Sequence, residues 1–141
     1  MAEDRSAMEM LGSVGLFKDL SDAELREIAA EAKEVEFEPG RNIVTEGEVG
    51  VGFHMILDGR AKVTQSGRDV SELGPGDYFG DISLIDRGPR SATVTAETEV
   101  RTLSLISWDF LPLVERNPSI ASKLLTQMCK RLRAAEASLT H

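Results

Sequence analysis

Residues 79–94 read FGDISLIDRGPRSATV, and this stretch says most about the fold and about a candidate site. Gly80 and Asp81 stand at the start of a short apolar segment that is expected to form a helical turn. A glycine–proline turn then leads to Arg90, which opens a β-branched strand. Free backbone N–H groups at a helix start attract anions, and glycine lets a ligand approach the backbone closely. The stretch therefore predicts an anion site between a helical turn and a strand.

Arg90 and Asp81 narrow the chemistry of the ligand. An arginine can hold a phosphate through two charge-assisted hydrogen bonds. A carboxylate only accepts hydrogen bonds, so it suits a sugar hydroxyl and disfavours a second phosphate. The pair predicts a ligand that carries one phosphate and one hydroxyl close together.

On both sides of this stretch, hydrophobic residues alternate with polar ones over short segments. Val35 and Phe37 alternate with three glutamates before the Pro39-Gly40 break. Glycine- and proline-rich turns separate the later segments, and such turns are typical of hairpins. The pattern predicts an antiparallel jelly-roll β-sandwich of about eight strands. Besides the first segment, the strands are expected at 42–45, 52–57, 60–65, 69–73, 77–79, 91–97 and 99–106.

Helical periodicity flanks the strands. Ser21 and Glu24 form a capping-box pattern that starts a helix over 22–32, and a shorter helix is expected to end near Gly12. A short helix from Ser107 and one of about 20 residues after Asn117-Pro118 follow the strands. The fold class is therefore mainly β with flanking helices (α+β). We expect one domain over 1–141, with N-terminal helices in 6–32, a β-roll over 34–106 and C-terminal helices over 107–139.

Composition and charge exclude several classes of protein. One cysteine allows neither an internal disulfide nor a zinc site built on cysteine pairs, and no apolar run is long enough to span a bilayer. The first five residues show no secretory signal, so a cytoplasmic location is expected. The net charge of −8 disfavours nucleic-acid binding by this chain. Only residues 117–141, with a charge of +3, suit an acidic partner.

No residue pattern indicates an enzyme. The two histidines, His54 and His141, are too few and too far apart for a catalytic metal centre, so no metal is expected. No serine has a nucleophile-elbow context, and the glycines form no nucleotide-triphosphate or dinucleotide motif. His54 is interpreted as a partly buried structural residue, Cys129 as a structural thiol, and Trp108 as packed beneath the final helices.

Taken in order, these motifs resemble the cyclic nucleotide-binding domain family, of the type found in catabolite activators and regulatory subunits of cAMP-dependent protein kinase. The resemblance runs from about Leu16 to Arg133. It rests on Phe79-Gly80, Leu84 and Pro89-Arg90-Ser91-Ala92-Thr93-Val94, and upstream on Pro39-Gly40, Glu46-Gly47, Asp58-Gly59 and Gly74-Pro75-Gly76-Asp77-Tyr78-Phe79.

The resemblance implies a role for each part of the phosphate-binding cassette, 79–94. Arg90 would pair with a cyclic phosphate, helped by backbone N–H groups around Ser83 and Ser91. Gly80 and Asp81 would hold the ribose 2′-hydroxyl, and the base would lie on the sheet under the last helix. The implied ligand is cAMP, with cGMP left open, and no cofactor is implied. The implied binding residues are Phe79, Gly80, Asp81, Ile82, Ser83, Arg90, Ser91 and Ala92.

Three departures from the family pattern leave two hypotheses open. Asp81 replaces the usual glutamate and is shorter by about 1.5 Å. Ser83 replaces an alanine, and Ala135-Glu136 stands where some relatives carry a base-contacting Thr-Ser pair. The first hypothesis is a sensor in which the ligand repositions the C-terminal helices. The alternative is a degenerate relative that has lost the ligand and serves as a dimerisation or docking module.

The last helix also predicts partners. Leu125, Met128, Leu132, Ala135 and Leu139 repeat at alternating spacings of three and four residues. Such a stripe suits either packing on the chain's own β-roll or a homodimer seam. A homodimer is favoured, with an effector protein or a missing effector domain left unidentified.

Overall fold

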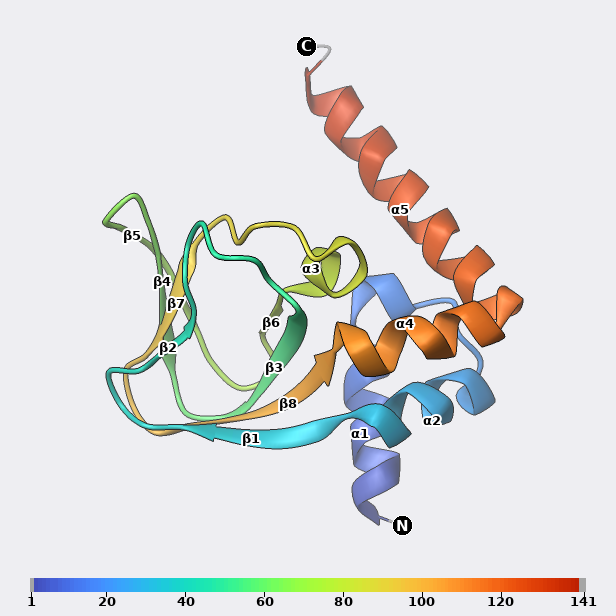
Figure 1. Ribbon diagram of the computed structural model, residues 1–141, viewed down its shortest axis with the longest axis horizontal. Helices are drawn as coiled ribbons and strands as arrows, with labels where there is room; N and C mark the ends of the chain where they lie inside the picture. The colour runs from blue at the N-terminus through green and yellow to red at the C-terminus, as the bar shows by residue number, and fades with distance from the viewer. Residues whose placement is uncertain (1, 140–141) are drawn as a thin grey trace. The chain divides into compact units, whose positions relative to one another are not determined.

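The computed structural model describes residues 2–139, which divide into two compact units (Figure 1). The β unit comprises residues 31–110. The helical unit is made of the segments before and after it, up to residue 30 and from residue 111. The chain passes from one to the other within helix α4, Ser107–Arg116.

The β unit is built from two antiparallel four-stranded sheets. One sheet has the strand order β1-β8-β3-β6 and the other has the order β2-β7-β4-β5. Each predicted strand is present within about two residues of its expected bounds, so the eight-stranded sandwich is confirmed. The strands are β1 Lys33–Phe37, β2 Asn42–Val44, β3 Gly52–Asp58, β4 Ala61–Gln65, β5 Arg68–Leu73, β6 Tyr78–Phe79, β7 Thr93–Ala96 and β8 Val100–Ile106.

The alternation of the strands directs their apolar side chains to a common interior. The buried residues of this core come from the four strands β3, β4, β7 and β8: Ile56, Ala61, Val94, Ala96 and Val100. Partly buried side chains pack against them, namely Phe37, Ile43, Val44, Val63, Leu73 and Phe79. Several of the second group also face the cavity described below, so one set of side chains serves both the core and the candidate site.

The helical unit begins with α1, Ala2–Gly12, the 3-10 helix η1, Gly15–Phe17, and α2, Asp22–Glu31. The predicted capping box of α2 is confirmed. The Ser21 N–H donates to Glu24 Oε1 at 2.8 Å, and the Glu24 N–H donates to Ser21 Oγ at 3.2 Å. The chain ends with α5, Pro118–Leu139, which contacts η1.

Glu24 also joins α2 to α5. Its carboxylate accepts hydrogen bonds from Lys123 Nζ at 2.6 Å and Ser119 Oγ at 2.7 Å. The bond from Lys123, with those from Ser21 and Ser119, lowers the pKa of Glu24 to about 2. A further hydrogen bond joins α5 to the segment between η1 and α2, because the Gln127 side chain donates to the Asp19 carboxylate. The first turns of α5 are thus held by polar contacts as well as by buried Ile120 and Leu124.

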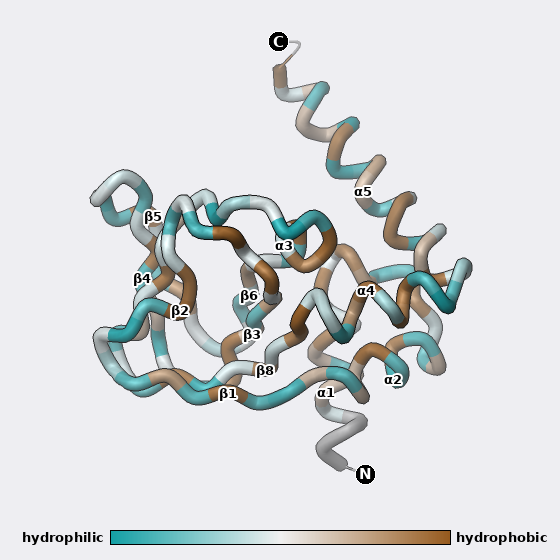
Figure 2. Tube along the Cα trace, in the orientation of Figure 1, coloured by the Kyte–Doolittle hydropathy of each residue, from teal (hydrophilic) through white to brown (hydrophobic). Residues whose placement is uncertain are grey.

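The later part of α5 presents apolar residues that stay exposed in this chain. Hydrophobic and hydrophilic residues alternate along the helix (Figure 2). The side chains of Leu125, Leu132 and Leu139 are all exposed. Among the described residues, 2–139, no helix combines the length and the apolar character that crossing a membrane requires.

Two expectations about single residues were wrong. Trp108 is 60% exposed, and the Arg87 guanidinium lies 5.1 Å from the centre of its ring. Cys129 is also exposed instead of packed. Both residues lie on helices, as expected, but the helical pattern of the sequence does not specify which face a neighbouring element covers.

Candidate functional site

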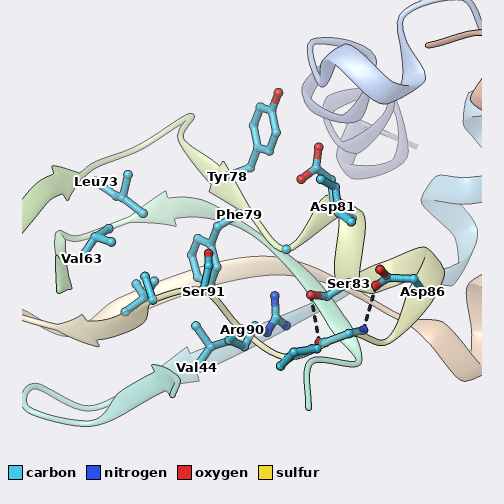
Figure 3. Close-up of a pocket in the computed structure, with 16 residues that line it drawn as sticks. Val44, Val63, Leu73, Tyr78, Phe79, Asp81, Ser83, Asp86, Arg90 and Ser91 are labelled. Atoms are coloured by element: carbon cyan, nitrogen blue, oxygen red, sulfur yellow. Dashed lines mark hydrogen bonds between the residues drawn. The ribbon is translucent and has the colours of Figure 1, made fainter. Parts of the chain in front are cut away.

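A cavity of about 480 Å³ opens in the β unit, beside residues 79–94 (Figure 3). All eight residues named from the sequence line it. The structure therefore brings the predicted set together, and their role in binding remains a prediction. The other lining residues are Val44, Val63, Leu73, Tyr78, Asp86, Gly88, Pro89 and Val94.

Gly80 makes the sharp change from strand β6 to the short helix α3, Asp81–Asp86. Its φ of 87° lies in the left-handed region, which costs glycine little and other residues more. The Leu84 N–H closes the first helical bond to the Gly80 carbonyl at 2.9 Å. At the other end Arg87, with φ 54°, donates its N–H to the Ser83 carbonyl and ends the helix. The predicted helical turn after Gly80 is confirmed.

The segment that carries Arg90 is paired to an earlier loop. The Arg90 N–H donates to the Glu48 carbonyl at 2.8 Å, and the Gly47 N–H donates to the Arg90 carbonyl at 2.9 Å. The Gly50 N–H donates to the Gly88 carbonyl at 3.0 Å. These hydrogen bonds hold the main chain of Arg90 on both sides, so the position of its Cα atom is fixed.

The Arg90 side chain is a buried cation that lacks a counter-charge. It is 9% exposed, and its Nη2 donates to the Gly52 carbonyl. Its Nε is buried without a hydrogen-bond partner, and no carboxylate among residues 6–139, whose side chains the structure describes, forms an ion pair with it. Burial lowers the pKa of Arg90. Because buried charges are normally paired, this guanidinium calls for an anion in the cavity.

Two glycines, Gly50 and Gly80, make room for the Arg90 side chain. A Cβ atom at Gly50 would lie 2.3 Å from Arg90 Nε, and one at Gly80 would lie 2.4 Å from Arg90 Nη1. The carbonyl of Gly52 is the acceptor described above. Gly50 and Gly52 lie about 40 residues before Arg90 in the chain. Only the spacing of glycines in 47–52 hinted at a close approach there, and it did not identify the neighbour.

His54 lies in β3 near this site and stays uncharged at neutral pH. Its ring lies between Phe37 and Phe79, with centroid separations of 6.1 and 5.4 Å. Its Nδ1 is 2.7 Å from Ser104 Oγ. Burial, and secondarily the positive charge of Arg90, lower the pKa of His54 to about 4. The expectation of a partly buried structural histidine is confirmed. Among residues 6–139, whose side chains the structure describes, no cluster of metal-ligating side chains occurs.

The cavity has a polar end and an apolar end. In Figure 3, Ser83 and Asp86 lie at one end, Val63 and Leu73 at the other, and Arg90 between them. Val44 and Val94 add to the apolar wall. Ser91 is exposed, and its carbonyl accepts a hydrogen bond from Gln65 Nε2 at 3.1 Å. A ligand with an anionic part and a flat apolar part would match this division.

Ser107 connects the cavity to the start of α4 within the β unit. Its hydroxyl lies within hydrogen-bonding distance of the Leu84 carbonyl at 2.8 Å and of the Val51 carbonyl at 3.0 Å. A serine at a helix start is typical of a cap, but the Ser107 hydroxyl instead bonds to α3 and to the segment before β3. A displacement of α3 would therefore stretch or break a hydrogen bond of Ser107, the first residue of α4.

Comparison with known proteins gives consistent results. A family model described as the cyclic nucleotide-binding domain matches residues 34–117. A CRP-like cAMP-activated global transcriptional regulator from Mycobacterium tuberculosis is 29% identical over 136 residues, 93% of this chain and 61% of the regulator. A cGMP-dependent protein kinase from Toxoplasma gondii is 41% identical over 96 residues, 68% of this chain and 9% of the kinase. The chain thus spans about three fifths, or less, of these relatives.

A solved structure shows the same fold. The crystal structure of the N-terminal domain of a transcriptional regulator from Streptomyces coelicolor superposes with a TM-score of 0.80 at 34% identity. The match covers 89% of this chain and 94% of that domain.

Proposed function

Because this chain belongs to the cyclic nucleotide-binding domain family, we propose that it is a non-catalytic sensor whose cavity binds a cyclic nucleotide, most readily cAMP. One observation carries the proposal. Arg90 is buried in the cavity with an unpartnered Nε, and no carboxylate among residues 6–139 forms an ion pair with it. A cyclic phosphate, with one negative charge and two free oxygens, supplies the counter-charge and the acceptor that this guanidinium lacks.

The rest of the nucleotide fits the remaining walls of the cavity. Asp81 and the Gly80 backbone lie beside the cavity at the start of α3, where a ribose hydroxyl can donate to a carboxylate. The apolar wall of Val44, Val63 and Leu73 suits the face of a base. An apolar wall distinguishes adenine from guanine weakly. We favour cAMP because a relative matched over most of this chain is named as cAMP-activated.

We propose that ligand occupancy is relayed through α3 to the C-terminal helices, and that the β unit and the helical unit act as one regulatory domain. The bond from Ser107 to the Leu84 carbonyl supports the first step, because it joins α3 to the start of α4. The family match supports the proposal of one regulatory domain, because it covers residues 34–117 and so includes parts of both units. A ligand shifts such an equilibrium only by its differential affinity for the two arrangements.

The direct test is calorimetric titration with cAMP and cGMP of the chain and of two matched variants. Arg90→Lys keeps the charge but loses the planar two-point contact, so cAMP affinity should fall by at least about tenfold. Arg68→Lys changes an exposed arginine on β5, outside the cavity, and should leave affinity unchanged. Absence of heat and of thermal stabilisation with both nucleotides at millimolar concentration would refute the proposal.

The alternative hypothesis, a docking module that has lost its ligand, is motivated by the short side chain of Asp81 and by Ala135-Glu136 on the last helix. An Asp81→Glu exchange separates the two. A large gain in cAMP affinity would indicate a lapsed site, whereas little change on a chain that already binds would mean that the aspartate suffices. Titration of the unaltered chain and of Asp81→Glu with cAMP under the same conditions decides between the two hypotheses.

We also propose that α5 contributes to a homodimer. The support is the exposed apolar stripe of Leu125, Leu132 and Leu139. Sedimentation of the chain with and without cAMP tests this. The cytoplasmic location and the identity of the effector remain predictions.

A further inference from the structure

The cavity holds more negative than positive charge. Its charged lining residues are two aspartates, Asp81 and Asp86, and one arginine, Arg90. The whole chain adds a net charge of −8. An anion that enters the cavity is attracted by the Arg90 guanidinium and repelled by the Asp86 carboxylate.

Asp86 is the carboxylate that the proposed ribose contact does not use. It stands at the last position of α3. One of its oxygens, Oδ1, accepts the Gly88 N–H at 2.7 Å, which holds the loop toward Arg90. The structure records no other hydrogen bond to Asp86, and no ion pair joins it to Arg90. Asp86 is an exposed residue of the cavity lining, so solvent screens its charge in part, and the remaining field acts on whatever occupies the cavity.

The magnitude of that effect depends on the charge of the ligand. A cyclic phosphate is a diester and carries a single negative charge. An open-chain phosphate monoester carries about −1.5 to −2 at pH 7, because its second ionisation occurs near pH 6. Since Coulomb energy scales with the product of the charges, Asp86 repels the monoester up to about twice as strongly as the diester.

We propose that Asp86 is a specificity-determining residue that favours a cyclic nucleotide over its open-chain 5′-monophosphate. This inference rests on the proposed function. Asp86 does this by its negative charge and not by a contact: it disfavours the second charge of the monoester while the single Arg90 neutralises the charge of the diester. The family resemblance assigned no role to this position.

Asp86→Asn is a close test, because asparagine keeps the oxygen that accepts the Gly88 N–H and removes only the charge. The measured quantity is the ratio of the Kd of 5′-AMP to the Kd of cAMP at pH 7.5. We expect Asp86→Asn to lower this ratio by about threefold to tenfold, the effect of one partly screened charge. Glu36→Gln removes an exposed charge of β1 outside the cavity and should leave the ratio unchanged.

A second measurement needs no variant. In the unaltered chain the ratio should fall as the pH is lowered from 7.5 to 5.5, because 5′-AMP loses its second charge and cAMP keeps its single one. In Asp86→Asn this fall should be smaller. Thermal unfolding of each variant shows whether the fold is retained.

The outcomes separate the two proposals. If the chain binds neither nucleotide, the proposed function fails and this inference fails with it. If cAMP binds but Asp86→Asn leaves the ratio within twofold of the unaltered chain, the proposed function stands and the role of Asp86 is refuted. A ratio that does not depend on pH in the unaltered chain would also refute it.

Discussion

Replacement of Gly50 by alanine tests whether the position of Arg90 governs binding. Gly50 makes no contact proposed for the ligand, yet a Cβ there would lie 2.3 Å from Arg90 Nε and 2.7 Å from Arg90 Cζ. Ordinary contacts begin at 3.4 Å, so the two groups must separate by about 1.1 Å. The Gly50 main chain is tied to the Gly88 carbonyl, and therefore most of the movement should fall on the guanidinium.

The expected loss follows from that displacement. A shift of this size breaks the bond from Arg90 to the Gly52 carbonyl and misaligns the guanidinium with the phosphate. A hydrogen bond to a charged group contributes about 1.5–3 kcal/mol, so the Kd of cAMP should rise by about tenfold to 150-fold. Crowding in a packed region should also lower the free energy of unfolding by about 1–3 kcal/mol.

The assay is titration with cAMP, paired with thermal unfolding of the unliganded protein. Gly74→Ala is the matched control, because no heavy atom lies within 4 Å of its Cβ position and its φ is outside the left-handed region. It should bind cAMP as the unaltered chain does. If Gly50→Ala binds cAMP within twofold of the control, close packing against Arg90 does not govern the site.

Further tests concern residues outside the phosphate contact. Glu24→Gln keeps the capping bond but loses the pair with Lys123, so unfolding free energy at pH 7 should fall by about 1 kcal/mol after allowance for solvent. Because the folded pKa of Glu24 is lowered to about 2, this difference should be present above about pH 4.5 and vanish toward pH 2 in denaturant titrations. The pKa of His54 is lowered to about 4, so the unfolded state binds more protons below about pH 6.5 and stability should fall from there to pH 4. An unchanged acid limb in His54→Asn would contradict this assignment. Trp108 is the single tryptophan, and its emission should change saturably with cAMP, at the calorimetric midpoint, if α3 moves. Arg87→Ala should reduce that change, whereas a flat emission in a chain that binds cAMP would argue against movement at this contact.

The sequence predicted the strands, the capping box and the turn after Gly80 correctly. The strand bounds follow from alternation and from glycine and proline at the turns, which are properties of neighbouring residues. The capping box of Ser21 and Glu24 was predicted for the same reason and is confirmed by both hydrogen bonds. The turn after Gly80 was likewise predicted, because a positive φ is a local requirement that glycine meets.

The wrong predictions concern side chains whose burial or hydrogen bonds depend on residues far away in the sequence. The spacing of Trp108 placed it on a helix correctly, but burial depends on what covers the helix, and the residue is exposed beneath Arg87. Ser107 has the residue type of a cap, yet two carbonyls that lie 23 and 56 positions away in the chain accept its hydroxyl. Neither contact leaves a trace in the nearby sequence.

By itself, the sequence determined the order of strands and helices and eight of the sixteen residues that line the cavity. Hydrophobic period, turn chemistry and the 79–94 motif are encoded by adjacent positions. Only the tertiary structure decided how Arg90 is held, between Gly50, Gly80 and the Gly52 carbonyl, and that Asp86 shares its cavity without pairing to it. Those facts depend on segments about 40 residues apart meeting at one point, and long-range packing sets the distances on which charge and close contact act.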